Sequence, residues 1–147
     1  MDKTLILYRN AGEGSLPGVL DLLRQASLPL AGVAEHFSTF LVAEQDGRVI
    51  GTIGLEIYGE TALLRSAVVS PEFRNAGVGS GLFSRAHQMA AERGVRRLIL
   101  LTETAEEYFR KKGFVSIPAA SVRGPVTASV EFTGACPSTA VCMELRL

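Results

Sequence analysis

The chain lacks an excess of charge of either sign, and this absence narrows the class of partners. Its 15 Lys and Arg residues are balanced by 15 Asp and Glu residues, so the formal net charge is zero. A neutral protein lacks the electrostatic field that draws a chain to nucleic acid or to an anionic membrane surface. We therefore expect a small-molecule partner, with no nucleic acid and no membrane.

Cysteine and histidine are also scarce, which argues against disulfide and metal sites. The sequence holds Cys136 and Cys142, together with His36 and His87, which stand apart from one another. Two cysteines are too few for a disulfide framework, and the spacing typical of zinc ligands is absent from the sequence. We expect no metal ion, and we expect both cysteines to be small buried residues.

Long apolar runs and a signal-peptide pattern are missing as well, so a cytoplasmic protein is expected. The chain has 147 residues, of which 47% are hydrophobic. This length and composition suit a single domain over residues 1–147 with a core of its own. Internal repeats and low-complexity linkers are not seen in the sequence.

The order of apolar runs and turn residues predicts a mixed sheet covered by helices. Strands are expected at residues 4–8, 40–44, 48–58, 61–69, 97–102, 114–117 and 139–145. Helices are expected beginning at residue 16 and over 77–93 and 104–112, while 33–38 is a short helix or a loop and 125–132 a short helix or an edge strand. The result is an α/β (α+β) arrangement with about six or seven strands and about four helices.

Local signals support parts of this order. Asp46-Gly47 is typical of a tight hairpin turn, and Thr104-Ala105-Glu106-Glu107 matches a helix capping box. Apolar residues are nearly continuous in the strands between residues 40 and 69, which predicts a sheet covered on both faces.

A glycine-bearing loop joins the apolar strand 61–69 to the helix 77–93. Glycine lets the backbone approach a ligand closely, and the free N–H groups of a helix start form an anion site. Arginine adds forked donors that suit phosphate. The nucleotide P-loop ending Gly-Lys-Ser/Thr is absent, and the glycine spacing differs from the dinucleotide fingerprint. The sequence therefore predicts a phosphate or pyrophosphate cradle at Arg74, Asn75, Ala76, Gly77, Val78, Gly79 and Ser80.

The pattern Arg74-x-x-Gly77-x-Gly79, after an apolar strand and Ser70-Pro71, resembles motif A of the GNAT N-acetyltransferases. The later run Tyr108-Phe109-Arg110-Lys111-Lys112-Gly113-Phe114 resembles the helix-to-strand junction of the same family. The resemblance covers roughly residues 40–117. It implies the GNAT fold and acetyl-coenzyme A as the cofactor.

The resemblance also implies how that cofactor is held. Backbone groups of Ala67, Val68 and Val69 would pair with the pantetheine arm, and residues 74–80 would hold the pyrophosphate. A backbone N–H near Ala67 or Val68 would polarise the thioester carbonyl. Thr104 and Phe109 are expected to contact the cofactor as well.

Two residues are predicted to move protons. The acceptor amine must be neutral to attack, and Glu56, late in the strand 48–58, is the candidate base, with apolar neighbours expected to raise its pKa. The alternative is an end-of-strand glutamate that reaches solvent. Many members of the family place an acidic tyrosine where Phe109 stands here. Tyr108 is the candidate acid, although one helical residue is about 100° of rotation, and packing or cofactor contact is the alternative. Weaker candidates for the base are Glu35, Glu60 and Glu103.

Arg65 and Ser66 interrupt an apolar run inside a strand of the buried type. A buried arginine needs a partner, which Glu56 or Glu131 would supply. Alternatively, Arg65 and Ser66 hold the carboxylate of an amino-acid-like substrate. The segment 28–38, which contains His36, is expected to cover the acceptor, so His36 is a further candidate substrate residue.

Three further pieces resemble the arsenic-resistance N-acetyltransferases. They are Glu56-x-Tyr58-Gly59 before Leu63-Leu64-Arg65-Ser66, Thr104-Ala105-Glu106-x-Tyr108-Phe109, and Glu131-Phe132 before Cys136-Pro137-Ser138-Thr139-Ala140. This resemblance implies acetylation of the α-amine of glutamate-like arsenical or phosphinic amino acids. Single-domain N-acetylglutamate synthases share some of these features.

The sequence thus favours an N-acetyltransferase that acts on a small primary amine by direct attack. One alternative is an acetyl-coenzyme A-binding module without catalysis, for which Phe109 at the tyrosine position is the support. Another is an acetyltransferase for a peptide or protein amine. A homodimer formed through the segment 118–137 is also expected from the resemblance.

Overall fold

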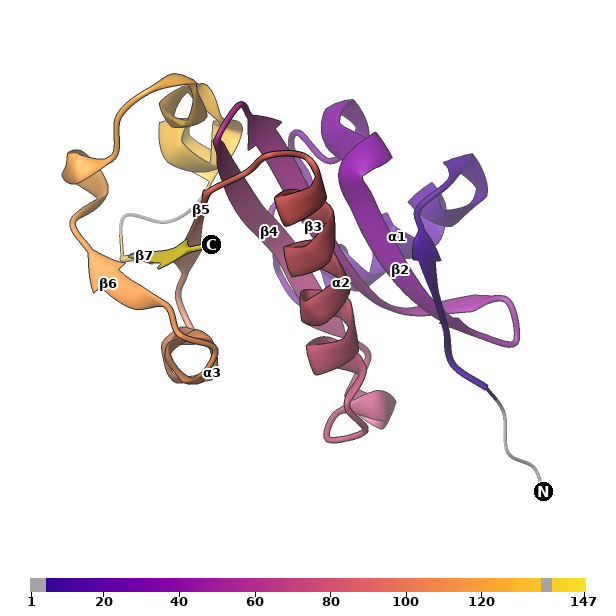
Figure 1. The fold of residues 1–147 in the computed structure, drawn as a ribbon. Helices are drawn as coiled ribbons and strands as arrows, with labels where there is room; N and C mark the ends of the chain where they lie inside the picture. Colours follow the sequence, from indigo (N-terminus) through magenta and orange to yellow (C-terminus); the bar gives the residue numbers. More distant parts are fainter. Residues whose placement is uncertain (1–4, 136–138) are drawn as a thin grey trace.

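The computed structural model describes residues 5–135 and 139–147. They form a seven-stranded sheet in the order β1-β2-β3-β4-β5-β7-β6 (Figure 1). Its strands are β1 (Leu7–Asn10), β2 (Phe40–Gln45), β3 (Arg48–Tyr58), β4 (Thr61–Val69), β5 (Arg97–Thr102), β6 (Val115–Ile117) and β7 (Val141–Arg146). The β4–β5 pair is parallel and the other neighbouring pairs are antiparallel, which confirms the expected mixed sheet.

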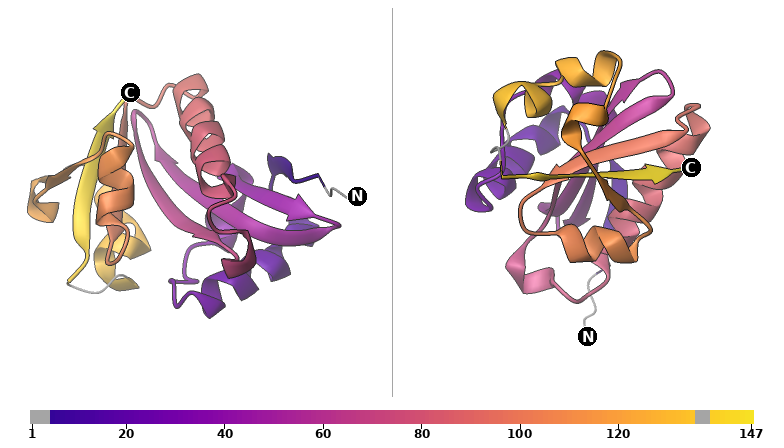
Figure 2. Two further views of the ribbon diagram at one scale, coloured as in Figure 1. Left: turned by 90° about the horizontal axis from the view of Figure 1, so that it is seen from below. Right: turned by 90° about the vertical axis from the view of Figure 1, so that its left-hand side faces the viewer.

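Helices cover both faces of the sheet, as the apolar strands predicted. Figure 2 shows α1 (Leu16–Gln25) and α2 (Val78–Glu92) on opposite sides of it. The helix α2 buries a stripe of Val78, Leu82, Phe83, Ala86 and Ala90 against the strands, in one cluster with Phe109 of α3 (Glu106–Lys111). On the other face Val19 and Leu23 of α1 pack against Phe40 and Val42.

Most of the predicted elements are found close to their expected bounds. The strands β3, β4 and β5 match the expected ranges, and the hairpin turn has positive φ at Asp46 (54°) and Gly47 (75°). The segment 33–38, predicted as a short helix or a loop, largely coincides with the 3-10 helix η2 (Ala34–Thr39). Residues 125–132 form the 3-10 turn η5 (Pro125–Ala128) and the start of the π-turn η6 (Glu131–Ala135), not an edge strand.

Two expectations at the ends of elements are corrected. The first strand begins at Leu7 rather than at residue 4, which lies outside the described residues. The capping box at Thr104 is wrong, because α3 begins at Glu106 and Ala105 precedes it. The hydroxyl of Thr102 instead accepts a hydrogen bond from the backbone N–H of Ala105 at 3.0 Å. The described chain holds three α-helices, and its remaining helical segments are 3-10 or π.

An extra residue in β4 opens the sheet. Thr52 pairs with Val68 and Gly54 pairs with Arg65, so two residues of β4 face one residue of β3. Ser66, one of those two, has a left-handed φ of 59°. Such a bulge bends the strand and increases its twist. In the described chain β4 pairs with β5 only through residues 61–63, and the two strands then separate (Figure 1).

Close packing of β2 on β3 gives a test of the fold. A Cβ added at Gly54 would lie 2.3 Å from ring atoms of Phe40, which has no exposed surface. Gly54→Ala should therefore lower the free energy of unfolding by about 1–3 kcal/mol through overpacking. Urea denaturation measures the change. Gly14→Ala is the matched control, because nothing lies within 4 Å of its added Cβ. Equal stability of the two variants would contradict this packing.

Candidate active site

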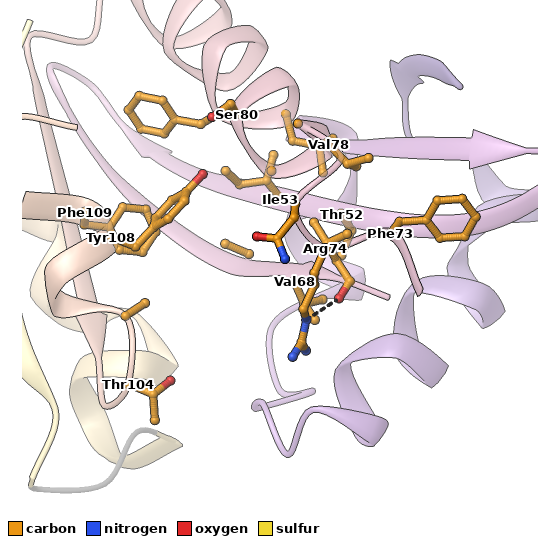
Figure 3. Close-up of a pocket in the computed structure, with 18 residues that line it drawn as sticks. Thr52, Ile53, Val68, Phe73, Arg74, Val78, Ser80, Thr104, Tyr108 and Phe109 are labelled. Atoms are coloured by element: carbon orange, nitrogen blue, oxygen red, sulfur yellow. Dashed lines mark hydrogen bonds between the residues drawn. The ribbon is translucent and has the colours of Figure 1, made fainter. Parts of the chain in front are cut away.

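A cavity of about 480 Å³ lies between β4, the loop before α2, and α3 (Figure 3). Its walls include eleven of the twelve residues predicted to bind the cofactor, with Ala76 as the exception. They are Ala67, Val68, Val69, Arg74, Asn75, Gly77, Val78, Gly79, Ser80, Thr104 and Phe109. The structure thus brings together residues from three elements that are distant in the sequence.

The loop before α2 has the backbone shape of an anion cradle. Asn75 and Gly77 have left-handed φ values of 68° and 82°, and Gly77 directly precedes α2. The first N–H groups of a helix lack intrahelical partners and attract anions. A Cβ at Gly79 would lie 3.2 Å from the Tyr108 hydroxyl oxygen, so a side chain there would narrow the groove. Arg74 lies at the mouth, its Nε 3.4 Å from the carbonyl oxygen of Val69.

Tyr108 and Phe109 are neighbours in α3 but occupy different parts of the site. Tyr108 is 42% exposed and lines the first cavity beside Gly79. The Nζ of Lys112 lies 5.4 Å from the Tyr108 ring centroid and donates a hydrogen bond to Ser80. Phe109 is buried against Phe114. Tyr108 therefore faces the end of the groove that the glycine loop forms, and its role as an acid stays a prediction.

A second cavity of about 720 Å³ joins the first at the bulge in β4. The residues that line both are Ala67, Val68, Val69, Arg74, Thr104, Ala105 and Phe109. Further walls come from residues 26–29 after α1, from Arg65 and Ser66 in β4, from the end of β5, and from Glu131 in η6. The two cavities thus meet at residues 67–69 of β4, beyond the part of this strand that pairs with β5.

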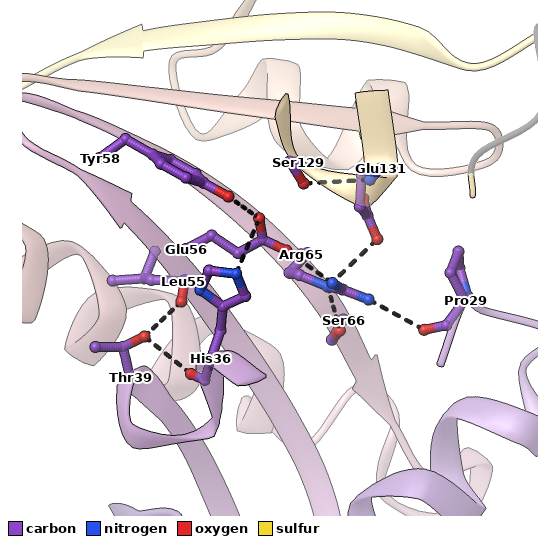
Figure 4. A network of polar contacts seen from close by, with 10 residues as sticks. All are labelled: Pro29, His36, Thr39, Leu55, Glu56, Tyr58, Arg65, Ser66, Ser129 and Glu131. Atoms are coloured by element: carbon purple, nitrogen blue, oxygen red, sulfur yellow. Dashed lines mark hydrogen bonds and ion pairs between the residues drawn. The ribbon is translucent and has the colours of Figure 1, made fainter. Parts of the chain in front are cut away.

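A buried ionic network centred on Arg65 forms part of the wall of the second cavity. Figure 4 shows its side chains. The Arg65 side chain has no exposed surface, and its Nη1 donates a hydrogen bond to Glu56 Oε2 at 2.7 Å. Its Nε donates to Ser66 Oγ at 3.1 Å and lies 3.3 Å from Glu131 Oε2. Its Nη2 donates to the carbonyl oxygen of Pro29 at 3.2 Å. Arg65 pairs with both glutamates that the sequence offered, while its grip on a substrate carboxylate stays a prediction.

Glu56 is held by polar partners rather than by apolar neighbours. Burial raises the pKa of Glu56, but hydrogen bonds from Tyr58, Ser129 and Arg65, together with the nearby His36, lower it by more. The net pKa therefore lies below the ordinary value of 4.5. The expectation of a raised pKa is therefore wrong. Tyr58 Oη donates to Glu56 Oε1 at 2.5 Å, and burial together with this bond raises the pKa of Tyr58 to about 12.

Two predicted residues stand apart from both cavities. Glu56 has a side chain only 1% exposed, and it lines neither cavity of the described chain. His36 also lines neither, and its Nε2 lies 3.6 Å from Glu56 Oε1. Glu56 as base and His36 as substrate residue stay predictions. Sequence reasoning missed Tyr58, although its position two residues after Glu56 on one strand places both side chains on the same face.

The described residues contain no group of three or more metal-binding side chains. Cys142 is buried, as expected, and burial raises the pKa of its thiol to about 11. Cys136 lies outside the described residues. Over the same part of the chain, every helix is too short or too polar to cross a membrane.

Known proteins resemble this chain in sequence and in fold. The sequence model of the acetyltransferase (GNAT) domain matches residues 36–116, more than half of the chain. An amino-acid acetyltransferase of Aeromonas salmonicida is 36% identical over 108 residues, which cover 66% of this chain and 24% of that protein. The chain thus spans about a quarter of that relative's length.

Two solved structures share the fold. The N-acetylglutamate synthase from Neisseria gonorrhoeae, complexed with coenzyme A and N-acetyl-glutamate, has a TM-score of 0.82 and 21% identity, over 99% of this chain and 36% of that one. A Mycobacterium tuberculosis protein in complex with CoA and NLQ has a TM-score of 0.81 and 22% identity, over 96% and 99% of the two chains.

The lowered pKa of Glu56 predicts how stability depends on pH. The folded state binds fewer protons than the unfolded state near 4.5, so the stabilisation is present above that value and is lost as pH falls through the folded pKa. At neutral pH, Glu56→Gln should cost about 3 kcal/mol, because Arg65 loses a buried partner. The difference from the wild type should shrink in acid, as followed by urea denaturation.

Glu72→Gln is the matched control for this prediction. Glu72 pairs with Arg48 at 2.9 Å in an exposed position, where solvent screens the pair and its loss matters far less. Equal losses at Glu56 and Glu72 would contradict the importance of the buried network.

Proposed function

Because the chain belongs to the GNAT acetyltransferase family, we propose that it transfers an acetyl group from acetyl-coenzyme A to the primary amine of a small amino-acid-like acceptor. The observation that carries this proposal is the meeting of two cavities at Ala67, Val68 and Val69. One cavity carries the anion cradle, and the other is a separate compartment for the acceptor. The amino-acid acetyltransferase relative supports the acceptor class.

The first cavity fits acetyl-coenzyme A. Its cradle at residues 74–80 would take the pyrophosphate, and the free edge of β4 at Ala67–Val69 would pair with the amides of the pantetheine arm. The close approach of Tyr108 to Gly79 leaves a narrow groove of the kind that an extended ligand needs. When bound, acetyl-coenzyme A supplies a thioester whose carbonyl carbon accepts the amine.

The chain's own groups would assist the attack. A backbone N–H of β4 near Ala67 or Val68 would stabilise the negative charge that develops on the carbonyl oxygen. Glu56, the base predicted from sequence, would have to act across Arg65, because it lines neither cavity. Tyr108, the acid predicted from sequence, lies beside Gly79 at the cradle end of the groove, so it would have to protonate the thiolate through water. An alkyl thiol with a pKa of about 8.5 can also take its proton from water.

The wall formed by residues 26–29 supports a small acceptor rather than a peptide. This segment lines the second cavity, and its end at Pro29 is tied to Arg65 by a hydrogen bond. A peptide would need an open channel at this wall. Within the amino-acid class, the resemblance to arsenic-resistance N-acetyltransferases favours glutamate-like arsenical or phosphinic amino acids as acceptors.

A panel of amines tests the proposal. Release of coenzyme A from acetyl-coenzyme A is measured with glutamate, phosphinothricin, other amino acids, polyamines and short peptides. Turnover should be found with free amino acids or their phosphinic analogues and should be lower with peptides. Tight cofactor binding with no turnover on any amine would instead favour the non-catalytic module, for which the buried Phe109 at the tyrosine position is the supporting observation.

Arg74 provides a second test, directed at the cofactor site. Arg74→Ala should raise the KM for acetyl-coenzyme A about 10-fold with little change in kcat, because one charge-assisted hydrogen bond to phosphate contributes about 1.5 kcal/mol. Steady-state kinetics at saturating acceptor separate the two constants. Arg48→Ala is the control, since this exposed arginine pairs with Glu72 and lines neither compartment. The same rise in KM for both variants would refute a specific role for Arg74.

A further inference from the structure

One carboxylate of the buried network also forms part of the acceptor compartment. Glu131 in η6 lines the second cavity, and its side chain is 5% exposed. Arg65 also lines this cavity, but its side chain has no exposed surface, and Glu56 does not line it. Glu131 is therefore the accessible end of the chain of contacts that runs from Glu56 through Arg65.

Arg65 holds both carboxylates of this network. One guanidinium faces two carboxylates, and Arg65 is closer to Glu56 (2.7 Å) than to Glu131 (3.3 Å). A buried carboxylate on the wall of the cavity attracts a cation, because the low dielectric strengthens the attraction. The side chains that also face this network include His36, 3.6 Å from Glu56, and the hydroxyls of Tyr58, Ser66 and Ser129.

The other charged side chains on the wall of the second cavity do not provide a buried carboxylate for a cation. Arg74 lies on the side that both cavities share, at the cofactor cradle. Glu103 is exposed and accepts a hydrogen bond from Thr139 at 2.7 Å, so water screens its charge. Glu131 alone among the cavity's described carboxylates combines burial with a fixed position beside an arginine.

We infer that Glu131 binds the ammonium group of the acceptor and accepts its proton, with Arg65 and Glu56 as positioning residues. The inference rests on the proposed function and names a catalytic residue for it. A primary amine arrives in water mainly as its ammonium ion, the species that a buried carboxylate attracts. Arg65, fixed by Glu56 and by the Pro29 carbonyl, holds the Glu131 carboxylate at the cavity wall.

The proton balance is complete. The ammonium gives one proton to the Glu131 carboxylate, and the neutral nitrogen then forms the C–N bond with the thioester carbon. The C–S bond breaks, and the thiolate takes the second proton that the nitrogen loses, through water. Glu131 returns its proton to solvent after the amide leaves, so one acetyl group is transferred and one proton is released.

Acceptors of different basicity test the assignment. Glu131→Gln should lower kcat/KM about 100-fold or more for the amine acceptor, the size expected for loss of a general base. An aminooxy analogue of that acceptor, whose nitrogen is unprotonated at neutral pH, should lose far less. Glu131→Ala should regain activity as formate is added, because a small carboxylate can occupy the vacated position. A merely structural glutamate would show neither response.

Matched variants complete the experiment. Glu56→Gln should lose activity equally on both acceptors and should gain nothing from formate. Cofactor affinity and thermal unfolding report whether each variant folds, and Glu131→Ala replaces Glu131→Gln if the latter does not. Unchanged kcat/KM for the amine acceptor in Glu131→Ala without formate would overturn the assignment.

The assignment of Glu131 would also be overturned if Glu131→Gln lost kcat/KM equally on the amine and aminooxy acceptors. Rescue by formate at Glu56 instead of Glu131 would overturn it as well. Wild-type turnover is measured first, because its absence on every amine would overturn the proposed function and this assignment together. If the wild type turns over and the Glu131 variants keep its kcat/KM, the role of Glu131 is refuted while the proposed function stands.

Discussion

The site depends on the bulge in β4, where Ser66 and Ala67 together face a single residue of β3. The bulge places Ser66 in the left-handed region at φ 59°, a conformation that a non-glycine residue adopts at some cost. The hydrogen bond from Arg65 Nε to Ser66 Oγ helps to hold it there. Because β4 bends at this point, its edge separates from β5 and remains available between the two cavities.

The network around Arg65 serves the same region in a second way. An arginine without exposed surface is tolerated only when carboxylates and carbonyls compensate its lost hydration. Here the compensation comes from β3, from the loop after α1 and from η6, through Glu56, Pro29 and Glu131. The network thereby ties β3 to residues 26–29, β4 and η6, which line the second cavity, and a change in any partner is expected to alter the shape of that cavity.

The two compartments differ in what builds them. The first cavity, proposed for the cofactor, is formed largely by regular elements, the strand β4, the start of α2 and the helix α3. The second cavity, proposed for the acceptor, takes part of its lining from residues 26–29 and from Glu131 of η6, which lie outside the regular elements. Loops on a rigid scaffold vary more readily than the scaffold does, so a shared fold leaves the acceptor to be decided by these segments.

The sequence by itself determined the features that arise from local physics. The bounds of β3, β4 and β5, the hairpin at Asp46-Gly47 and the loop before α2 follow from apolar periodicity, turn residues and glycine placement within a few residues. Tertiary structure decided the rest. The pKa of Glu56 is lowered because Arg65, Ser129 and His36 reach it from other elements, and the place of Glu131 beside the acceptor cavity depends on how η6 packs over β4. Contacts between distant residues leave no local pattern, since burial and electrostatic environment arise only when the chain has folded.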